Sequence, residues 1–297
     1  MKLELSPQQI HGEIERILGF IRSHLLPSEK AVIGVSGGLD SDVVTRLTLK
    51  ALGPDRLKLF TVCQDDMEER HLSNARQLAA SVQVPLIEVD LTEFPFSFLR
   101  VLAQADPVER FRPDGLLDPS RAKCSVRTLV FSTYQDRGYV IVGTSNRTEY
   151  ETGFFLPLGD GLWHIAPIIH LYKTQVRQLG RYLGTHQAVL DQPASAGFWS
   201  GQNDLEDLSY WLYHGAPIGE EIDFDEEAMT QVNEIHKYLT TESVDLALLG
   251  LAKNVDGQEI SEVSGFPLSL VRQLESLRNE ARRKKHRPLG KRLDNYS

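Results

Sequence analysis

Residues 36–44 read SGGLDSDVV, and their types and spacing are suited to holding phosphate. They directly follow the apolar run AVIGV, so a strand, a glycine-rich turn and a helix are expected in this order. Such an arrangement points free backbone N–H groups and the positive end of the helix at one place, where an anion binds. The two glycines let a ligand approach the backbone closely. The loop is therefore a candidate phosphate-binding site.

This loop differs from the common nucleotide-binding loops. No lysine follows the glycines as in G-x-x-x-x-G-K-[ST], and the spacing does not match G-x-G-x-x-G. Asp40 instead places a carboxylate at the start of the helix, where it would repel phosphate unless a divalent cation lay between them. Asp40 therefore suggests a bound magnesium ion. The alternative interpretation is an inert turn in which Asp40 only caps the helix.

Strands alternate with helices around this loop. The apolar runs predict strands over 31–35, 57–63, 84–90 and 139–144, and a last strand over 163–168. Helices are predicted from the loop to about residue 52 and over 67–81, 126–136 and 173–183. Residues 94–119, rich in proline and aromatic side chains, are expected to be irregular. This alternation is typical of an α/β fold with a doubly wound parallel sheet flanked by helices.

The whole chain, residues 1–297, is predicted to form a single domain, although its length also permits two. Ser6 and Pro7 favour the start of an N-terminal helix over 6–26. The α/β core is expected over about 28–190, and a helical appendage over about 193–297. Within the appendage, the acidic run 219–227 is interpreted as a solvated loop or helix start. The basic run 281–292 is either a solvated tail or a flap that closes over an anionic substrate.

The composition excludes several classes of protein. The net charge is −9, which argues against a nucleic-acid-binding protein, since these need a basic surface. No run approaches the roughly 20 apolar residues of a membrane-spanning helix, and the N-terminus does not read as a signal peptide. The two cysteines, Cys63 and Cys124, permit at most one disulfide. A cytoplasmic protein with no nucleic-acid or membrane partner is expected.

The motif SGGLDS resembles the pyrophosphate loop S-G-G-x-D-S of the N-type ATP pyrophosphatases, which cleave ATP between the α and β phosphates and form an adenylate. Three further stretches, at 143–161, 166–184 and 192–210, look like the ammonia-dependent NAD synthetases in order and spacing. The resemblance covers most of the chain. It implies an adenine nucleotide alpha hydrolase-like fold and synthesis of NAD from nicotinic acid adenine dinucleotide, ATP and ammonia.

The resemblance also implies a role for each matching residue. The leaving pyrophosphate would be held by Ser36, Gly37, Gly38 and Ser41. Asp40 and Glu149 would ligate Mg²⁺. Asp160 matches an aspartate that lines the amide-forming site, where it could accept a proton from ammonia. The residues implied to contact ATP or its phosphates are Thr144, Lys173 and Ser195. Taken singly, each has a duller interpretation as a surface, turn or helix-end residue.

The family is homodimeric, with the dinucleotide at the subunit interface, and the same is expected here. The chain leaves no room for a glutamine-hydrolysing domain beside the synthetase-like part. Free ammonia or a separate glutaminase would therefore supply the nitrogen.

The acyl-substrate part departs from the family pattern. Ser125, in KCSVR, replaces the middle arginine of a K-x-R-x-R run, and His164 stands where the family has an aspartate. The segment 156–158, LPL, lacks a lysine and a tyrosine of T-K-Y-G-D-G. The C-terminus lacks the H-K-R-x-x-P pattern. These changes leave the identity of the carboxylate substrate open.

Two other functions compete with amide synthesis. Some relatives in the superfamily transfer sulfur through a cysteine near position 124, and Arg121, Lys123 and Arg127 could lower the pKa of Cys124. A buried, inert cysteine is the alternative. A nucleotide-binding sensor without catalysis is the third hypothesis, although binding alone would not need Asp40, Glu149 and Lys173 together.

Overall fold

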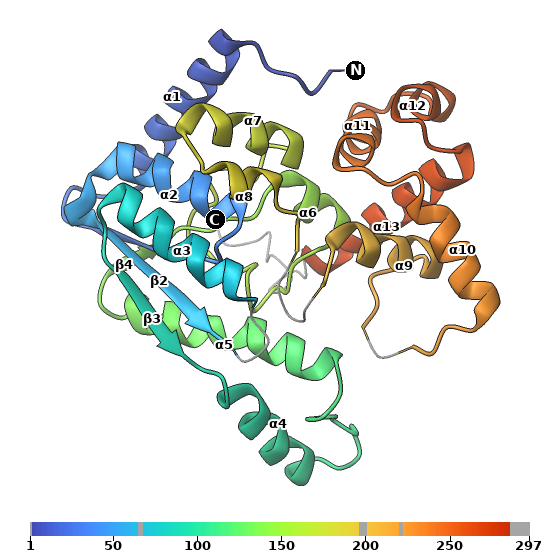
Figure 1. Ribbon diagram of the computed structural model, residues 1–297, viewed down its shortest axis with the longest axis horizontal. Helices are drawn as coiled ribbons and strands as arrows, with labels where there is room; N and C mark the ends of the chain where they lie inside the picture. Colours follow the sequence, from blue (N-terminus) through green and yellow to red (C-terminus); the bar gives the residue numbers. More distant parts are fainter. Residues whose placement is uncertain (1, 65–67, 196–200, 220–221, 286–297) are drawn as a thin grey trace, which may run out of the picture.

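A computed structural model describes residues 2–64, 68–195, 201–219 and 222–285 (Figure 1). Its centre is a four-stranded parallel sheet in the order β3-β2-β1-β4. The strands are β1 (Lys30–Gly34), β2 (Leu57–Cys63), β3 (Leu86–Asp90) and β4 (Tyr139–Ile141). The predicted parallel α/β class is confirmed. The order reverses between β1 and β4, and in open α/β sheets ligands bind beside the carboxyl ends of the strands at such a reversal.

Helices cover both faces of the sheet. Because side chains alternate along a strand, Ala31 and Ile33 point to one core cluster and Val32 points to another. The first cluster is completed by α1 (Pro7–His24), α2 (Leu39–Leu52), α3 (Glu69–Val82) and α7 (Lys173–Leu183). The second cluster lies under α5 (Leu117–Gln135), through Val130, Phe131 and Tyr134.

The remaining helices extend this core. They are η1 (Pro54–Arg56), α4 (Phe94–Ala105), α6 (Arg147–Thr152), α8 (Gln187–Asp191), α9 (Asp204–His214), α10 (Glu226–His236), α11 (Thr241–Ala252), α12 (Gly257–Ser264) and α13 (Leu268–Lys285). Helices α9 to α13 lie together at one side of the sheet (Figure 1) and have their own apolar core around Leu248, Phe266 and Leu274. This is the helical appendage expected after residue 193.

Residues 94–119 are more regular than predicted. They contain α4, and α5 begins at Leu117 instead of near Val126. The misleading signals were Pro95 and Pro119. Both stand in the first turn of their helices, where a backbone N–H has no partner to lose, so proline is tolerated there. The prediction of an irregular segment holds for residues 106–116 and is wrong for residues 94–105 and 117–119.

The predicted last strand over 163–168 is also wrong. It is reduced to one parallel bridge between Val142 and Ile165, and β4 ends at Ile141. The backbone N–H of Ile141 donates to Nδ1 of His164 at 2.9 Å. The His164 side chain thus accepts the hydrogen bond that the backbone carbonyl of a neighbouring strand would otherwise accept. Further along, Pro167 has no backbone N–H to donate to β4.

The two charged runs lie at the edge of the described residues. Asp225, in the acidic run, caps α10 by accepting from the N–H of Ala228 at 2.8 Å. This fits the interpretation of a loop leading into a helix. In the basic run, Ala281 and Arg282 belong to α13, and residues 286–292 lie outside the described part of the chain. Among the described residues, no helix has the length and apolar character needed to cross a membrane.

Candidate active site

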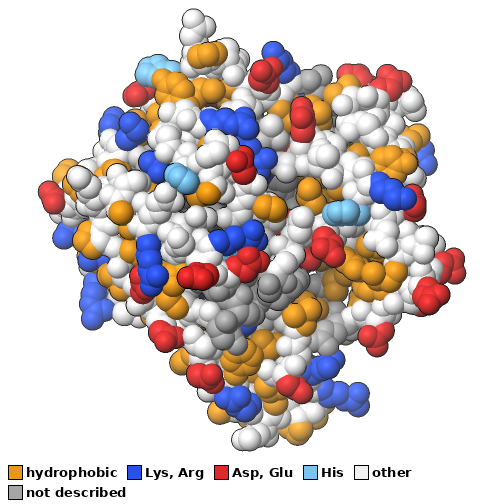
Figure 2. Space-filling model, viewed as in Figure 1, with side chains coloured by type: hydrophobic (Ala, Val, Ile, Leu, Met, Phe, Trp, Pro, Cys, Tyr) orange, Lys and Arg blue, Asp and Glu red, His pale blue; other side chains and the backbone are white. Residues whose placement is uncertain are grey.

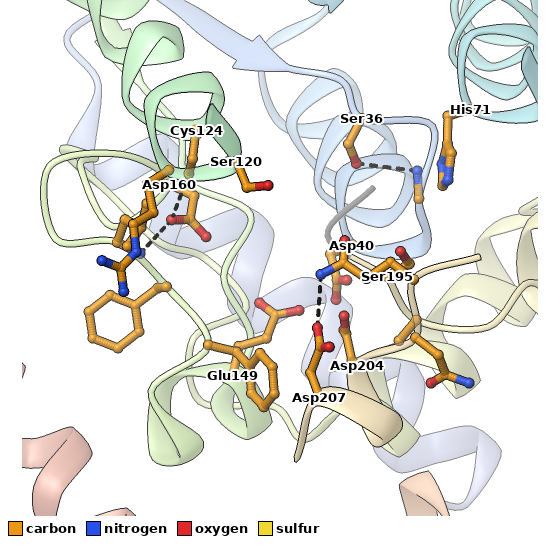
Figure 3. A pocket seen from close by; sticks show the side chains of 18 of the residues that line it. Ser36, Asp40, His71, Ser120, Cys124, Glu149, Asp160, Ser195, Asp204 and Asp207 are labelled. Atoms are coloured by element: carbon orange, nitrogen blue, oxygen red, sulfur yellow. Dashed lines mark hydrogen bonds between the residues drawn. The ribbon is translucent and has the colours of Figure 1, made fainter. Parts of the chain in front are cut away.

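One large cavity opens at the carboxyl ends of β1 and β4, where the strand order reverses. Its volume is about 1010 Å³. Eight of the ten predicted site residues line it, namely Ser36, Gly38, Asp40, Thr144, Glu149, Asp160, Lys173 and Ser195. Figure 3 shows Ser36, Asp40 and Ser195 at one end of the cavity and Asp160 at the other. The fold therefore brings together residues that lie up to 159 positions apart in the sequence (Ser36 to Ser195).

The loop between β1 and α2 is shaped by its two serines. The Ser41 hydroxyl accepts from the N–H of Ser36 at 3.2 Å and donates to the carbonyl of Gly38 at 3.0 Å. The Ser36 hydroxyl in turn accepts from the N–H of Gly38 at 3.3 Å. Ser41 is buried, 2% exposed, beneath the loop, so it shapes the cradle from below. Its direct contact with phosphate stays a prediction.

Gly37 allows this loop to pass close to α3. It has a φ of +78°, and a Cβ built there would lie 2.0 Å from the backbone carbonyl oxygen of His71. A side chain is thus excluded twice, by the left-handed conformation and by a backbone atom that cannot move aside.

Replacing Gly37 by alanine is expected to destabilise the protein more than replacing Gly53. Gly53 has a φ of +82°, and a Cβ added there would meet no atom within 4 Å, so Gly53→Ala carries only the conformational cost, about 1–3 kcal/mol. Gly37→Ala adds the clash with His71. Thermal and urea unfolding of the two variants measure the difference. Equal losses of stability would show that the approach to His71 carries no cost.

Lys173 lies between the two carboxylates that were predicted to bind metal. Its Nζ forms a short ion pair with Asp40 and lies 3.4 Å from Oε1 of Glu149. Asn146 supports both acids. Its side-chain amide donates to Asp40 at 3.0 Å, and its side-chain oxygen caps α6 at the N–H of Glu149, also at 3.0 Å. The three groups are therefore held by the start of α2, the start of α6 and the start of α7.

The charges in this cluster perturb one another. Burial and the neighbouring Asp40 raise the pKa of Glu149, and the cation of Lys173 only partly offsets them. Burial alone would lower the pKa of Lys173, but Asp40 and Glu149 outweigh it and raise that pKa. Asp204, at the start of α9, adds its field to both. Lys173 is thus a fixed cation among several carboxylates.

The same cluster suits a magnesium ion bound together with a nucleotide. Mg²⁺ is usually held by one or two carboxylates, with substrate phosphates and waters supplying the other oxygens. Asp40 and Glu149 provide two carboxylates that already share one cation. Within the described residues, no three metal-ligating side chains converge, so phosphate oxygens would have to complete the coordination.

Asp160 marks the other end of the cavity. Its Oδ1 accepts from the N–H of Leu156 at 2.8 Å and from the Cys124 thiol at 3.4 Å. The carboxyl is open to water inside the cavity, yet the surrounding protein desolvates it and raises its pKa, while the Leu156 N–H opposes this shift. A carboxylate with a raised pKa is a better proton acceptor than an ordinary aspartate.

Cys124 does not have the surroundings of a reactive thiolate. It is 2% exposed, and burial together with Asp160 raises its pKa to about 12, against the weaker opposing effect of Arg127. Lys123 lies over the ring of Phe96, 5.2 Å from its centre, and Arg121 donates to the carbonyl of Ile218. The prediction that these basic residues lower the pKa of Cys124 is wrong. The geometry favours the inert, buried cysteine.

The altered family positions have different surroundings. Ser125 is exposed and lies outside the cavity, Leu158 is 74% exposed, and His164 has a structural hydrogen bond to β4. Leu156 lines the cavity beside Asp160. Of these departures, only the one at Leu156 changes the cavity wall of the described structure.

Several polar residues that line the site were not predicted from the sequence. Asp204 and Asp207 of α9 line the cavity, and burial raises the pKa of Asp207 to about 6. The signal was present in GQNDLED, where Asn203 caps the helix and acids fill its first turn. His71 and Arg177 also line the cavity. No motif distinguished these two residues from surface residues.

The helical appendage fixes the helices that carry the site. Asp245 of α11 is fully buried and accepts from Thr148 of α6 at 2.5 Å and from the backbone N–H of Thr174 of α7 at 2.8 Å. Arg278 of α13 forms a buried ion pair with Glu151 of α6. These contacts lie directly behind Glu149 and Lys173, so the position of the two residues depends on the appendage.

Comparison with known proteins identifies the family. Residues 13–215 match the family model of NAD synthase, and the chain belongs to the NAD synthase family. It is 28% identical over 277 residues to an NH3-dependent NAD(+) synthetase of Pyrococcus horikoshii, covering 93% of each chain. Among solved structures, it is similar to an NMN synthetase from Francisella tularensis, with a TM-score of 0.70, 21% identity and coverage of 99% of this chain and 100% of the other. An NH3-dependent NAD synthetase from Campylobacter jejuni has a TM-score of 0.67, with 18% identity and coverage of 95% and 99%.

Proposed function

We propose that this protein makes NAD by amidating nicotinic acid adenine dinucleotide with ammonia at the expense of ATP, releasing AMP and pyrophosphate. Membership of the NAD synthase family and the related NH3-dependent synthetases support this reaction. The observation that carries it is the shared cavity. A phosphate loop and the Lys173 cluster stand at one end of the cavity, and a desolvated carboxylate, Asp160, stands at the other.

The first step would be attack of the substrate carboxylate on the α phosphorus of ATP. The loop N–H groups and Ser36 would hold the departing pyrophosphate, with Ser41 supporting the loop. Lys173 would stabilise the charge that develops on it. Thr144 and Ser195, which line the cavity, would contact the nucleotide and its phosphates. Bound between Asp40, Glu149 and the phosphates, Mg²⁺ would neutralise negative charge on ATP.

The second step would be attack of ammonia on the acyl-adenylate, with AMP leaving. The attacking nitrogen must lose a proton, and Asp160 would accept it. Free ammonia or a separate glutaminase would supply the nitrogen. The direct test supplies purified protein with ATP, Mg²⁺, ammonium and the dinucleotide. NAD, AMP and pyrophosphate should appear in equal amounts. ATP binding without any of these products would instead support a nucleotide sensor.

A mononucleotide is the second candidate substrate. The Francisella tularensis structure, which matches the chain from end to end in fold, is named as an NMN synthetase. The chain also departs from the family pattern at Leu156, which lines the cavity beside Asp160. Competition between nicotinic acid mononucleotide and the dinucleotide decides between them. The better substrate is the one with the higher kcat/KM.

We further propose that the chain acts as one domain and as a homodimer, with α4 and α5 at the interface. Phe98 and Val101 of α4 and Leu129 of α5 are 52%, 67% and 53% exposed, which is unusual for three large apolar side chains on adjacent helices. Figure 2 shows hydrophobic side chains in the region where Figure 1 places α4 and α5. Covering this face would remove apolar surface from water.

Charged residues on this face are expected to separate the dimer. Light scattering after gel filtration should give the wild type about twice the 33.5 kDa chain mass. The double variant Phe98→Glu, Leu129→Glu should give the mass of one chain. Leu26→Glu, at a 65% exposed residue outside α4 and α5, is the matched control and should remain dimeric. A monomeric wild type, or a dimeric double variant, contradicts this interface.

A further inference from the structure

Arg177 is a cation beside the phosphate loop that has no partner within the described part of the chain. It lines the cavity, and its Nε–H is buried with no hydrogen-bond partner. Among the described residues, no carboxylate forms an ion pair with its guanidinium. The residue as a whole is half-buried, but the Nε–H is not in contact with water, and buried donors in native proteins nearly always have an acceptor. The cavity wall therefore carries an anion-binding group that the protein itself does not use.

The position of Arg177 on α7 places it over the start of α2. Residues 173, 177 and 180 share one helix face, since they are separated by four and three positions. Lys173 contacts Asp40, the second residue of α2. A Cβ built at Gly180 would lie 2.9 Å from the Leu39 side chain, the first residue of α2. Arg177, between them on α7, therefore faces the helix end that the phosphate loop precedes.

His71 presents a second donor without a partner at the same loop. It is 5% exposed, it lines the cavity, and its Nε2 is buried with no hydrogen-bond partner. Its backbone carbonyl abuts Gly37 of the phosphate loop. Figure 3 shows His71 beside Ser36 at the phosphate end of the cavity. This unused group thus comes from α3, whereas Arg177 comes from α7.

The neighbours of His71 determine which ring nitrogen carries the proton. Asn74 donates its side-chain N–H to Oε1 of Gln192 at 2.9 Å, which leaves the Gln192 amide nitrogen as a donor. That nitrogen lies 3.1 Å from Nδ1 of His71, so Nδ1 accepts and Nε2 carries the hydrogen. Burial and Arg70 lower the pKa of His71, which keeps the ring neutral. His71 is thus held as a neutral donor toward the cavity.

We propose that Arg177 of α7 and His71 of α3 bind the pyrophosphate that leaves ATP at the SGGLDS loop. This inference rests on the proposed function. In the adenylation step the substrate carboxylate forms a bond to the α phosphorus, the bond from the α phosphorus to the bridging oxygen breaks, and its electron pair stays on pyrophosphate. The planar fork of Arg177 matches two phosphate oxygens, and the Nε2–H of His71 donates to a third.

The test is calorimetric titration of the full-length protein with inorganic pyrophosphate and Mg²⁺, and separately with AMP. A charge-assisted hydrogen bond contributes enough that Arg177→Gln should raise the pyrophosphate Kd by about 10–100-fold. A neutral donor contributes less, so His71→Leu should raise it by about 3–10-fold. AMP binding should stay within about twofold in both variants, since AMP lacks these phosphates. Arg181→Gln, one turn further along α7 at an exposed residue, is the matched control and should bind like the wild type.

Unchanged pyrophosphate binding in Arg177→Gln and His71→Leu overturns the inference, and so does an equal loss of pyrophosphate and AMP binding. If Arg177→Gln does not fold, Arg177→Lys replaces it, because lysine keeps the charge and loses only the planar fork. It should then weaken pyrophosphate binding selectively, and wild-type affinity in this variant again overturns the inference. Wild-type NAD formation is assayed in parallel. Arg177-dependent pyrophosphate binding without NAD formation refutes the proposed function and upholds this site.

Discussion

Lys173→Met is expected to slow the release of pyrophosphate from ATP by about 10²–10³-fold, the usual effect of removing one preorganised group from a developing charge. Lys173 is the cation between Asp40 and Glu149 at the phosphate end of the cavity. Methionine retains most of the unbranched side chain and removes the ammonium group, with its charge and its hydrogen bonds to Asp40 and Glu149. The reaction would then lose stabilisation of the leaving group, and two carboxylates would face the nucleotide without a fixed counter-charge.

Single-turnover release of pyrophosphate measures this effect without interference from the later amide step. Lys237→Met is the matched control, because Lys237 is an exposed lysine paired with Glu234 on α10. It should keep the wild-type rate. A rate for Lys173→Met within about threefold of wild type, in a protein shown to be folded by circular dichroism, would remove Lys173 from the reaction.

Asp160→Asn should separate the two halves of the reaction. Asparagine retains an oxygen for the Leu156 N–H but cannot accept a proton from ammonia. Adenylate formation should stay near the wild-type rate, whereas NAD formation should fall by about 10²–10⁴-fold, the range of general base catalysis. Asp55→Asn, at an exposed aspartate of η1, is the control. An equal loss of both steps would show that Asp160 does not act on the nitrogen.

The pH profile gives a second readout of Asp160. A proton acceptor must be ionised, so the rate of amide formation should fall as the pH drops through its pKa. Desolvation raises the pKa of Asp160, and this decline should therefore begin at a higher pH than the value of about 3.9 for a free aspartate. The rates are compared at equal concentrations of free ammonia. The decline should be missing from the residual activity of Asp160→Asn.

Much of the fold could be predicted from the sequence because its local signals are strong. The strand over 57–63 and the helix over 173–183 have the predicted bounds, since apolar runs and helical periodicity mark them clearly. Predictions failed where one residue type is compatible with two structures, as proline is with an irregular segment and with the first turn of a helix. Pro95 and Pro119 suggested broken structure but stand in the first turns of helices.

The site was predictable in part, for a related reason. Asp40 was predicted from its place in the glycine-rich loop and Lys173 from the family resemblance, and both line the cavity. Asp204 was missed although it lies in a capped helix start, and Asp245 was missed because its role depends on partners about 70 and 100 residues away, Thr174 and Thr148. For Cys124 the inert interpretation holds, because its burial raises the pKa of the thiol more than Arg127 lowers it.

The central claim is that this cavity activates a carboxylate as an adenylate, and exchange of labelled pyrophosphate into ATP without ammonium tests it most directly. Exchange requires that the first step occur and reverse before any nitrogen arrives. We predict that label enters ATP only when nicotinic acid adenine dinucleotide, or the corresponding mononucleotide, is present with Mg²⁺. Exchange that is equally fast with no carboxylate substrate would contradict this account. So would the absence of exchange with both nucleotides.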